Sequence, residues 1–191
     1  LRTPITRAKL GLEMLDDSSR KEELKEDVQE MATIVEDILE AERLKSNYTK
    51  LHKEDCFVED LLNETIRDYF SSEKRLKLHI EAHPEISLDK NRYKIVIKNL
   101  ISNALRYGSG KKVEVYLRQD SLCVRDYGEG IRSEDLPKIK DAFYRVEKSR
   151  TKNLGGIGLG LFLCGRIIEA HEHELHVDSE GLGKGLSLIH I

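Results

Sequence analysis

Residues 92–107 read RYKIVIKNLISNALRY and predict a strongly apolar helix. The late part of this helix carries Asn99 and Asn103, which are four positions apart and therefore share one face. Two side-chain amides in this arrangement can ligate a hard cation or hold phosphate oxygens. Two asparagines on a helix are more often part of an ordinary solvated surface, so the pair by itself does not establish a site.

The segments around this helix alternate between helical and strand-like patterns. Such an order predicts a mixed sheet with helices on one face, which is an α+β sandwich. The expected elements, in chain order, are a helix at Phe57–Tyr69, a strand at Leu76–Ile80, the helix quoted above, strands at Val113–Leu117 and Leu122–Val124, a helix at Leu159–Ala170 and a strand at Leu175–Val177.

The first 47 residues show a different pattern, typical of a coiled-coil seam. Apolar residues recur in steps of three and four from Leu1 to Leu15, and again from Leu24 to Leu44 after the turn-like Asp16–Ser19. We therefore expect an antiparallel helical hairpin over residues 1–47, followed by a second domain over 48–191. One such hairpin has too little apolar surface to be stable alone, which favours dimerisation into a four-helix bundle. A hairpin packed onto its own downstream domain is the alternative.

Composition excludes several classes of protein. The 191 residues contain 32 Lys+Arg and 35 Asp+Glu, so the net charge of −3 argues for mixed-charge helix surfaces and against a nucleic-acid scaffold. The longest weakly polar stretch is short and rich in glycine, which predicts no membrane span and a soluble fragment. The three cysteines are widely spaced among apolar residues, so we expect buried thiols and a reducing compartment. Residues 186–191 read LSLIHI, which is either a last strand or a translated sequencing adapter.

Two glycine-bearing clusters lie where expected elements end. Asp126–Ile131, DYGEGI, follows a strand; its glycines would let the backbone approach a flat ligand while the carboxylate accepts a hydrogen bond from an amino group such as that of adenine. An ordinary glycine turn is the other interpretation. Gly155–Leu161, GGIGLGL, leads into a helix and would expose backbone amides to an anion. It is neither a Walker A loop nor a G-x-G-x-x-G motif. Between these clusters, Phe143–Arg150 supplies cations that could close over phosphates.

In this order, behind a heptad hairpin, the clusters resemble the transmitter region of sensor histidine kinases. The resemblance runs from Leu1 to about Gly185. The matching segments are Leu1–Pro4 with the end of the H-E-L-R-T-P box, Asn99–Tyr107 with the N box, Asp126–Ile131 with the first glycine box, Phe143–Arg145 with the F box, Gly156–Leu161 with the second glycine box, and Gly183–Gly185 with the last glycine motif.

The resemblance implies a dimerisation and phosphoacceptor hairpin followed by a Bergerat-type (GHKL) domain that binds ATP with Mg²⁺. Asn103, assisted by Asn99, would hold the Mg²⁺, and Asp126 would read the adenine amino group. The residues implied to contact ATP are Asn99, Asn103, Arg106, Tyr107, Asp126, Gly128, Gly130, Ile131, Phe143, Tyr144, Gly156, Gly158, Leu159, Gly160 and Leu161.

The resemblance also implies catalytic roles and partners. Arg145 and Arg150 would neutralise charge on the γ-phosphoryl group during its transfer. Thr3 matches the family position whose hydroxyl helps to place water when the phosphorylated regulator is hydrolysed. The implied partners are a second copy of residues 1–47 and the receiver domain of a response regulator. The implied location is the cytoplasmic portion of a membrane-anchored sensor.

Two departures from the family pattern affect this interpretation. The phosphoacceptor histidine would lie two positions before Leu1, so we expect that this chain, as given, does not autophosphorylate. Ile157 replaces the usual threonine of the second glycine box, and Ala142 replaces a common proline of the F box, which predicts weakened nucleotide binding.

Two other functions remain open from the sequence. One is a degenerate transmitter that dimerises and docks a regulator or nucleotide without turnover. The other is a different ATPase with the same nucleotide fold, against which the heptad hairpin and the Phe143–Arg145 segment argue. His171, His173 and His176 could suggest a metal site, but their spacing is not that of a zinc-binding helix, and we expect solvated turn histidines.

Overall fold

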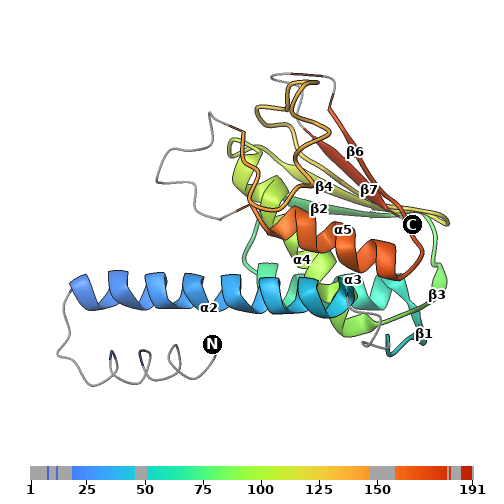
Figure 1. The fold of residues 1–191 in the computed structure, drawn as a ribbon. Helices are drawn as coiled ribbons and strands as arrows, with labels where there is room; N and C mark the ends of the chain where they lie inside the picture. Colours follow the sequence, from blue (N-terminus) through green and yellow to red (C-terminus); the bar gives the residue numbers. More distant parts are fainter. Residues whose placement is uncertain are drawn as a thin grey trace.

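The computed structural model describes residues 19–45, 51–146, 158–179 and 186–190, together with Ala8, Leu12 and Gly181. A five-stranded sheet, with helices against one of its faces, forms the main part of the molecule (Figure 1). The helices are α2 (Ser19–Lys45), α3 (Val58–Phe70), α4 (Lys90–Tyr107) and α5 (Gly160–Ala170), and the strands are β1 (Glu54–Phe57), β2 (Leu76–Ile80), β3 (Glu85–Leu88), β4 (Val113–Leu117), β5 (Leu122–Arg125), β6 (Leu175–Asp178) and β7 (Ser187–His190).

The main sheet has the strand order β2-β4-β5-β7-β6. β2 and β4 are parallel, with Leu76 opposite Val113, whereas the other neighbours are antiparallel. The sheet is therefore mixed, as the sequence predicts. The segment at 186–191, for which a last strand was one interpretation, supplies β7, and β7 lies between β5 and β6.

The core lies between this sheet and helices α3, α4 and α5. α4 supplies its centre, since Val96, Ile97, Leu100 and Ile101 are fully buried. Helix α5 adds a second buried row, with Leu163, Cys164, Ile167 and Ile168. The regularly spaced apolar side chains of α4 therefore face the sheet, which confirms the predicted α+β sandwich. Cys56 and Cys123 are buried as well.

A second, two-stranded sheet is formed by β1 and β3, and it is not among the elements expected from the sequence. The two strands are antiparallel, with Glu54 opposite Leu88 and Phe57 opposite Glu85. Each has only four residues and begins with an acidic side chain, so the alternation is too short to be recognised. β1 runs directly into α3, and β3 leads into α4 through its N-cap residue, Asp89.

Helix α2 runs across α5 on the side remote from the sheet (Figure 1). Near its end, Ala41 and Leu44 join the hydrophobic core, and Glu40 accepts a 2.7 Å hydrogen bond from the Arg92 guanidinium of α4. Most of the preceding helix expected from Leu1 lies outside the described residues, so the hairpin and the four-helix bundle remain predictions. No helix in the described ranges has the length and hydrophobicity needed to span a membrane.

Candidate functional site

The C-terminal end of α4 meets the end of β5, so the Asn99–Tyr107 cluster and the Asp126–Ile131 cluster lie together. Gly108 follows α4 directly, and a Cβ atom placed on it would lie 3.6 Å from the Cβ of Asp126. A Cβ atom on Gly128 would lie only 1.8 Å from the carbonyl oxygen of Tyr107. Only glycine permits this approach between two backbone segments, whereas the sequence pattern predicted that the glycines let the backbone approach a flat ligand.

Asp126 is the buried acidic group of this site, with 3% of its surface exposed. Its Oδ1 accepts hydrogen bonds from the backbone N–H groups of Gly128 at 2.9 Å and Leu186 at 3.2 Å. Burial raises the pKa of this carboxyl, and the two backbone hydrogen bonds partly oppose that shift. Within the described part of the chain both hydrogen bonds go to Oδ1, so Oδ2 is available for a ligand donor.

The segment after β6 closes the other side of the Asp126 loop. Gly130 has φ +66°, and a Cβ on it would lie 2.1 Å from the carbonyl oxygen of Gly181. The N–H of Ile131 donates to Ser179 Oγ at 3.0 Å. Ser179 and Leu186 were not among the predicted site residues. No local sequence signal identifies them, because their contribution depends on where β6 and β7 lie in the sheet.

Tyr127, directly after Asp126, ties the same loop to β4. Its hydroxyl donates to the buried carboxylate of Glu114, which also accepts from Lys112 Nζ at 2.9 Å. The hydrogen bonds from Tyr127 and Lys112 lower the pKa of Glu114 to about 2, so this carboxylate is ionised at neutral pH. The loop that carries Asp126 is thus attached to the sheet on both sides.

Asn99 faces the beginning of α5. A Cβ atom on Gly160 would lie 3.3 Å from Asn99 Oδ1, so the start of α5 passes close to the amide. Asn103 lies one turn further along α4 and is half-buried, whereas Arg106 and Tyr107 are exposed at its end. Amide oxygens suit a hard cation, and a helix N-terminus suits an anion, so the residues present fit a metal-bound phosphate group.

The Phe143–Arg145 segment is joined to the same end of α5. The N–H of Phe143 donates to the carbonyl oxygen of Gly158 at 3.0 Å, and Leu159, Gly160 and Leu161 follow directly. Phe143 itself is 58% exposed. Three predicted site residues, Thr3, Arg150 and Gly156, lie outside the described residues, as do Ile157 and the Gly183–Gly185 motif.

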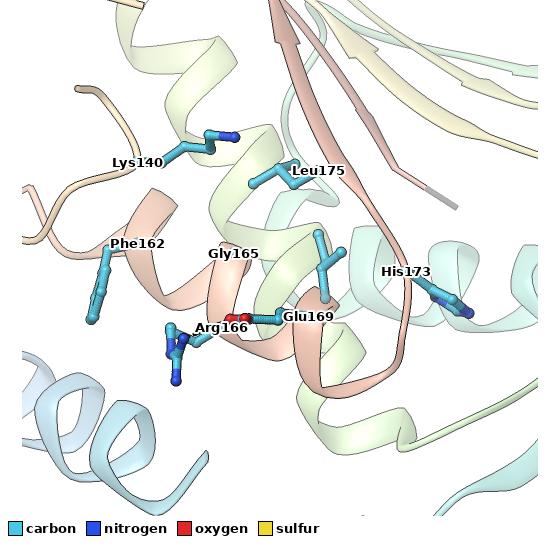
Figure 2. Close-up of a pocket in the computed structure, with 8 residues that line it drawn as sticks. Lys140, Phe162, Gly165, Arg166, Glu169, His173 and Leu175 are labelled. Carbon is cyan, nitrogen blue, oxygen red and sulfur yellow. Dashed lines mark hydrogen bonds and ion pairs between the residues drawn. The ribbon is translucent and has the colours of Figure 1, made fainter. Parts of the chain in front are cut away.

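A groove of about 300 Å³ lies elsewhere, between α5, Lys140 and the start of β6 (Figure 2). Figure 2 shows Lys140 and Phe162 at one end of it and His173 at the other, with Arg166 and Glu169 between them. The last two form an ion pair of 2.6 Å. None of the residues predicted to bind ATP lines this groove, so it is separate from the site at the end of α4.

The expectation of solvated turn histidines is wrong for His171. This side chain is 3% exposed; its Nε2 accepts from the N–H of Asp89 at 3.0 Å and its Nδ1 donates to the carbonyl oxygen of Ile167 at 2.7 Å. Burial lowers the pKa of His171, which favours the neutral ring. His171 therefore joins the start of α4 to the end of α5. In the described ranges no group of three metal-ligating side chains is assembled.

These features, a mixed sheet over three helices with a buried aspartate beside the end of the central helix, define an ATP-binding domain of the GHKL type. The family model described as "Histidine kinase-, DNA gyrase B-, and HSP90-like ATPase" matches residues 88–190, and the chain belongs to this family. Its curated relatives identify the branch. "Sensor protein kinase WalK" of Staphylococcus aureus is 30% identical over 207 residues, covering 97% of this chain and 50% of that protein.

The solved structures show the same fold. Full-length ShkA in complex with AMPPNP has a TM-score of 0.78 at 22% identity, covering 99% of this chain and 42% of that chain. The Acinetobacter baumannii histidine kinase AdeS has a TM-score of 0.73 at 22% identity, covering 100% of this chain and 95% of that chain. The chain spans half of the first WalK sequence and 34% of another. The predicted resemblance to a histidine kinase transmitter region is thus confirmed.

Proposed function

We propose that this chain is the cytoplasmic catalytic part of a two-component sensor histidine kinase, which phosphorylates a histidine upstream of Leu1 and passes the phosphoryl group to an aspartate of a response regulator. The observation that carries the proposal is Asp126. A buried carboxylate whose Oδ1 is occupied by backbone N–H groups offers Oδ2 to an amino group, as adenine recognition requires. The neighbour ShkA, solved with AMPPNP, supports a nucleotide as the ligand.

The residues around Asp126 would bind different parts of Mg²⁺-ATP. Asn103, with Asn99 beside the start of α5, would hold the Mg²⁺. The positive charge of the cation would offset the negative charge of the triphosphate. Arg106 would contact a phosphate, and Tyr107 the adenine and ribose. The backbone amides at Gly158–Leu161 would receive the remaining phosphate charge. The first and second glycine boxes would shape the pocket around these groups, as the sequence resemblance implies.

Transfer would proceed by in-line attack of the histidine imidazole nitrogen on the γ-phosphorus, with ADP as the leaving group. Arg145 and Arg150 would stabilise the negative charge that spreads over the equatorial phosphoryl oxygens. In a separate reaction, the hydrolysis of the phosphorylated regulator, Thr3 would help to place the attacking water. In this proposal the phosphoacceptor is not among residues 1–191, so we expect that these residues alone do not label themselves.

The test restores His-Glu ahead of Leu1 and incubates the extended and the present chain with γ-labelled Mg-ATP. We expect label on the extended chain only, stable in alkali and lost in acid, as a phosphoramidate requires. Replacing the restored histidine by glutamine is the matched control and should remove the label. An unlabelled extended chain that also fails to bind ATP would contradict the proposal and favour a regulator-docking module without turnover.

We further propose that residues 1–47 form the dimer interface. Helix α2 carries an exposed apolar stripe with a seven-residue repeat, because Leu24, Met31 and Ile38 are 42%, 49% and 38% exposed. Three large apolar side chains in heptad register are the pattern of a helix that packs against a partner helix. The exposed stripe supports the second copy of the hairpin, and with it the four-helix bundle, that the sequence predicts.

The dimer prediction can be tested with one lysine. In the chain extended by His-Glu, Met31→Lys should raise the dimer dissociation constant about 10- to 100-fold, because a charged side chain would be buried without a partner. Sedimentation equilibrium measures the constant. The control is Thr33→Lys, an equal change of charge at an exposed position two residues away and therefore on another face. Equal effects of the two substitutions would contradict an interface along the stripe.

A further inference from the structure

Asp135 is a buried carboxylate in the segment between β5 and α5, and nothing in the proposed nucleotide site uses it. The residue is 5% exposed. Its Oδ1 accepts a 2.6 Å hydrogen bond from the Tyr144 hydroxyl, and its Oδ2 accepts a 2.9 Å hydrogen bond from Arg132 Nε. Both carboxylate oxygens are therefore occupied by donors from its own segment, and Tyr144 is the donor next to Arg145.

The backbone beside Tyr144 adopts an unusual conformation. Phe143 has φ +66°, in the left-handed region that non-glycine residues rarely occupy. Such a residue keeps this conformation only when its surroundings hold it there. Two backbone hydrogen bonds do part of this, from the Phe143 N–H to the Gly158 carbonyl and from the Tyr144 N–H to the Asp141 carbonyl at 3.3 Å. The hydrogen bond from the Tyr144 hydroxyl to Asp135 is a side-chain contact that also holds this turn.

Gly158, two residues before α5, packs closely against the same turn. Gly158 has φ +81°, and a Cβ atom on it would lie 2.6 Å from the Tyr144 carbonyl oxygen and 3.0 Å from the Phe143 carbonyl carbon. The turn therefore cannot shift toward α5, and the Tyr144 hydroxyl keeps it from moving away from Asp135. A turn that is held by both contacts fixes the direction in which the next side chain leaves the backbone.

The protonation states suit a permanent contact. The hydrogen bond from Tyr144 lowers the pKa of Asp135, and the same bond raises the pKa of the Tyr144 phenol. At neutral pH the carboxylate is ionised and the phenol keeps its proton. The donor and the acceptor thus remain in their required forms throughout the physiological pH range.

We propose that Asp135 and Tyr144 are a positioning pair that sets the place of the Arg145 guanidinium for phosphoryl transfer. The inference rests on the proposed kinase function, and it changes the part that the sequence resemblance implies for Tyr144. The Tyr144 hydroxyl donates its hydrogen bond to Asp135 and does not serve as a nucleotide contact. A displacement of about 1 Å in a group that acts on the transition state can cost about 100-fold in rate, so the pair has a kinetic effect without touching ATP.

The test is Tyr144→Phe in the chain extended by His-Glu, compared with Tyr69→Phe. Tyr69 lies on α3 and is 52% exposed, so its substitution removes a phenol hydroxyl from the surface of another element. We expect Tyr144→Phe to lower the autophosphorylation rate at saturating ATP about 10- to 100-fold while the ATP dissociation constant changes less than about 3-fold. Tyr69→Phe should change neither.

A conservative variant of the acceptor gives a second measurement. Asp135→Asn keeps an oxygen that can accept from Tyr144, so it should lose less rate than Tyr144→Phe, whereas Asp135→Ala should lose at least as much. Combining Asp135→Ala with Tyr144→Phe should add little to the larger single effect, because both remove the same hydrogen bond. Thermal unfolding of each variant shows whether the fold is retained.

The outcomes separate this inference from the proposed function. A labelled parent chain with an unchanged rate in Tyr144→Phe overturns the positioning pair alone. A rise of the ATP dissociation constant that matches the loss of rate also overturns it, since Tyr144 would then act in nucleotide binding. An unlabelled parent chain overturns the proposed function, and the inference with it.

Discussion

Replacing Gly128 by alanine is expected to abolish nucleotide binding and to destabilise the fold by about 3 kcal/mol or more. The added Cβ would lie 1.8 Å from the Tyr107 carbonyl oxygen, 2.7 Å from the Tyr107 carbonyl carbon and 2.8 Å from Gly108 Cα. All three atoms belong to the backbone, so no side-chain rotation can relieve the overlap. The end of α4 and the Asp126 loop must separate, and this contact brings the two halves of the proposed ATP site together.

The matched control for that substitution is Gly165→Ala. Gly165 lies within α5, and a Cβ atom there would meet nothing within 4 Å. Alanine is the better helix former, so this variant should be about 0.5 to 1 kcal/mol more stable and should bind ATP as the parent does. Urea unfolding and titration with a fluorescent ATP analogue measure the two effects. Unimpaired ATP binding in Gly128→Ala would show that the contact between α4 and the loop is not required for the site.

Asp126→Asn is expected to weaken ATP binding while leaving the fold at least as stable. The amide oxygen can still accept from the N–H groups of Gly128 and Leu186, which hold the carboxylate at 2.9 and 3.2 Å. What is lost is the negative charge offered to the adenine amino group, and a hydrogen bond to a charged group is worth about 1.5 to 3 kcal/mol. The ATP dissociation constant should therefore rise about 10- to 100-fold.

The stability of the same variant should depend on pH in a defined direction. Burial raises the pKa of Asp126 above its ordinary value of 3.8, so the folded state holds this proton more tightly than the unfolded state. The stabilisation of the folded parent chain by the protonated Asp126 is therefore fully present below the ordinary pKa of 3.8. It is lost as the pH rises through the raised pKa of the folded state. Asparagine does not ionise, so the advantage of Asp126→Asn should be present at pH 7 and should shrink toward pH 4.

Thermal unfolding of both chains between pH 4 and 7, with ATP titrations at pH 7, measures these effects. Asp120→Asn in the exposed turn after β4 is the control, because it removes a carboxylate from a solvated position. It should change neither the ATP affinity nor the difference in stability with pH. An ATP affinity unaltered by Asp126→Asn would contradict adenine recognition by Asp126.

Several elements could be predicted from sequence because their patterns are local. The strand Leu76–Ile80 and the strand Val113–Leu117 have the predicted bounds, and α4 begins two residues earlier than expected because Asp89 caps it. Each of these has an apolar repeat long enough to distinguish a period of two from one of 3.6. β1 and β3 have four residues each, and for them no such repeat can be read.

Four side chains or segments illustrate what local patterns do not contain. His171 lies in a polar H-E-H-E stretch, which suggested solvent, but its ring is buried between α4 and α5. Ser179 and Leu186 take part in the proposed site only because β6 ends and β7 begins beside the Asp126 loop. Asp135 has no motif of its own, and its significance comes from the Tyr144 hydroxyl that reaches it.

The sequence by itself determined the family, since the residue types at Asn99–Tyr107, Asp126–Ile131 and Phe143–Arg145 and their order resemble a histidine kinase transmitter. It also determined the apolar faces of the helices and strands, because these depend on spacing along one chain. The tertiary structure alone decided which backbone groups hold Asp126, which glycine touches Tyr107 and which carboxylate binds Tyr144. The physical reason is that these contacts join residues from different elements, and their distances depend on how the sheet and helices pack.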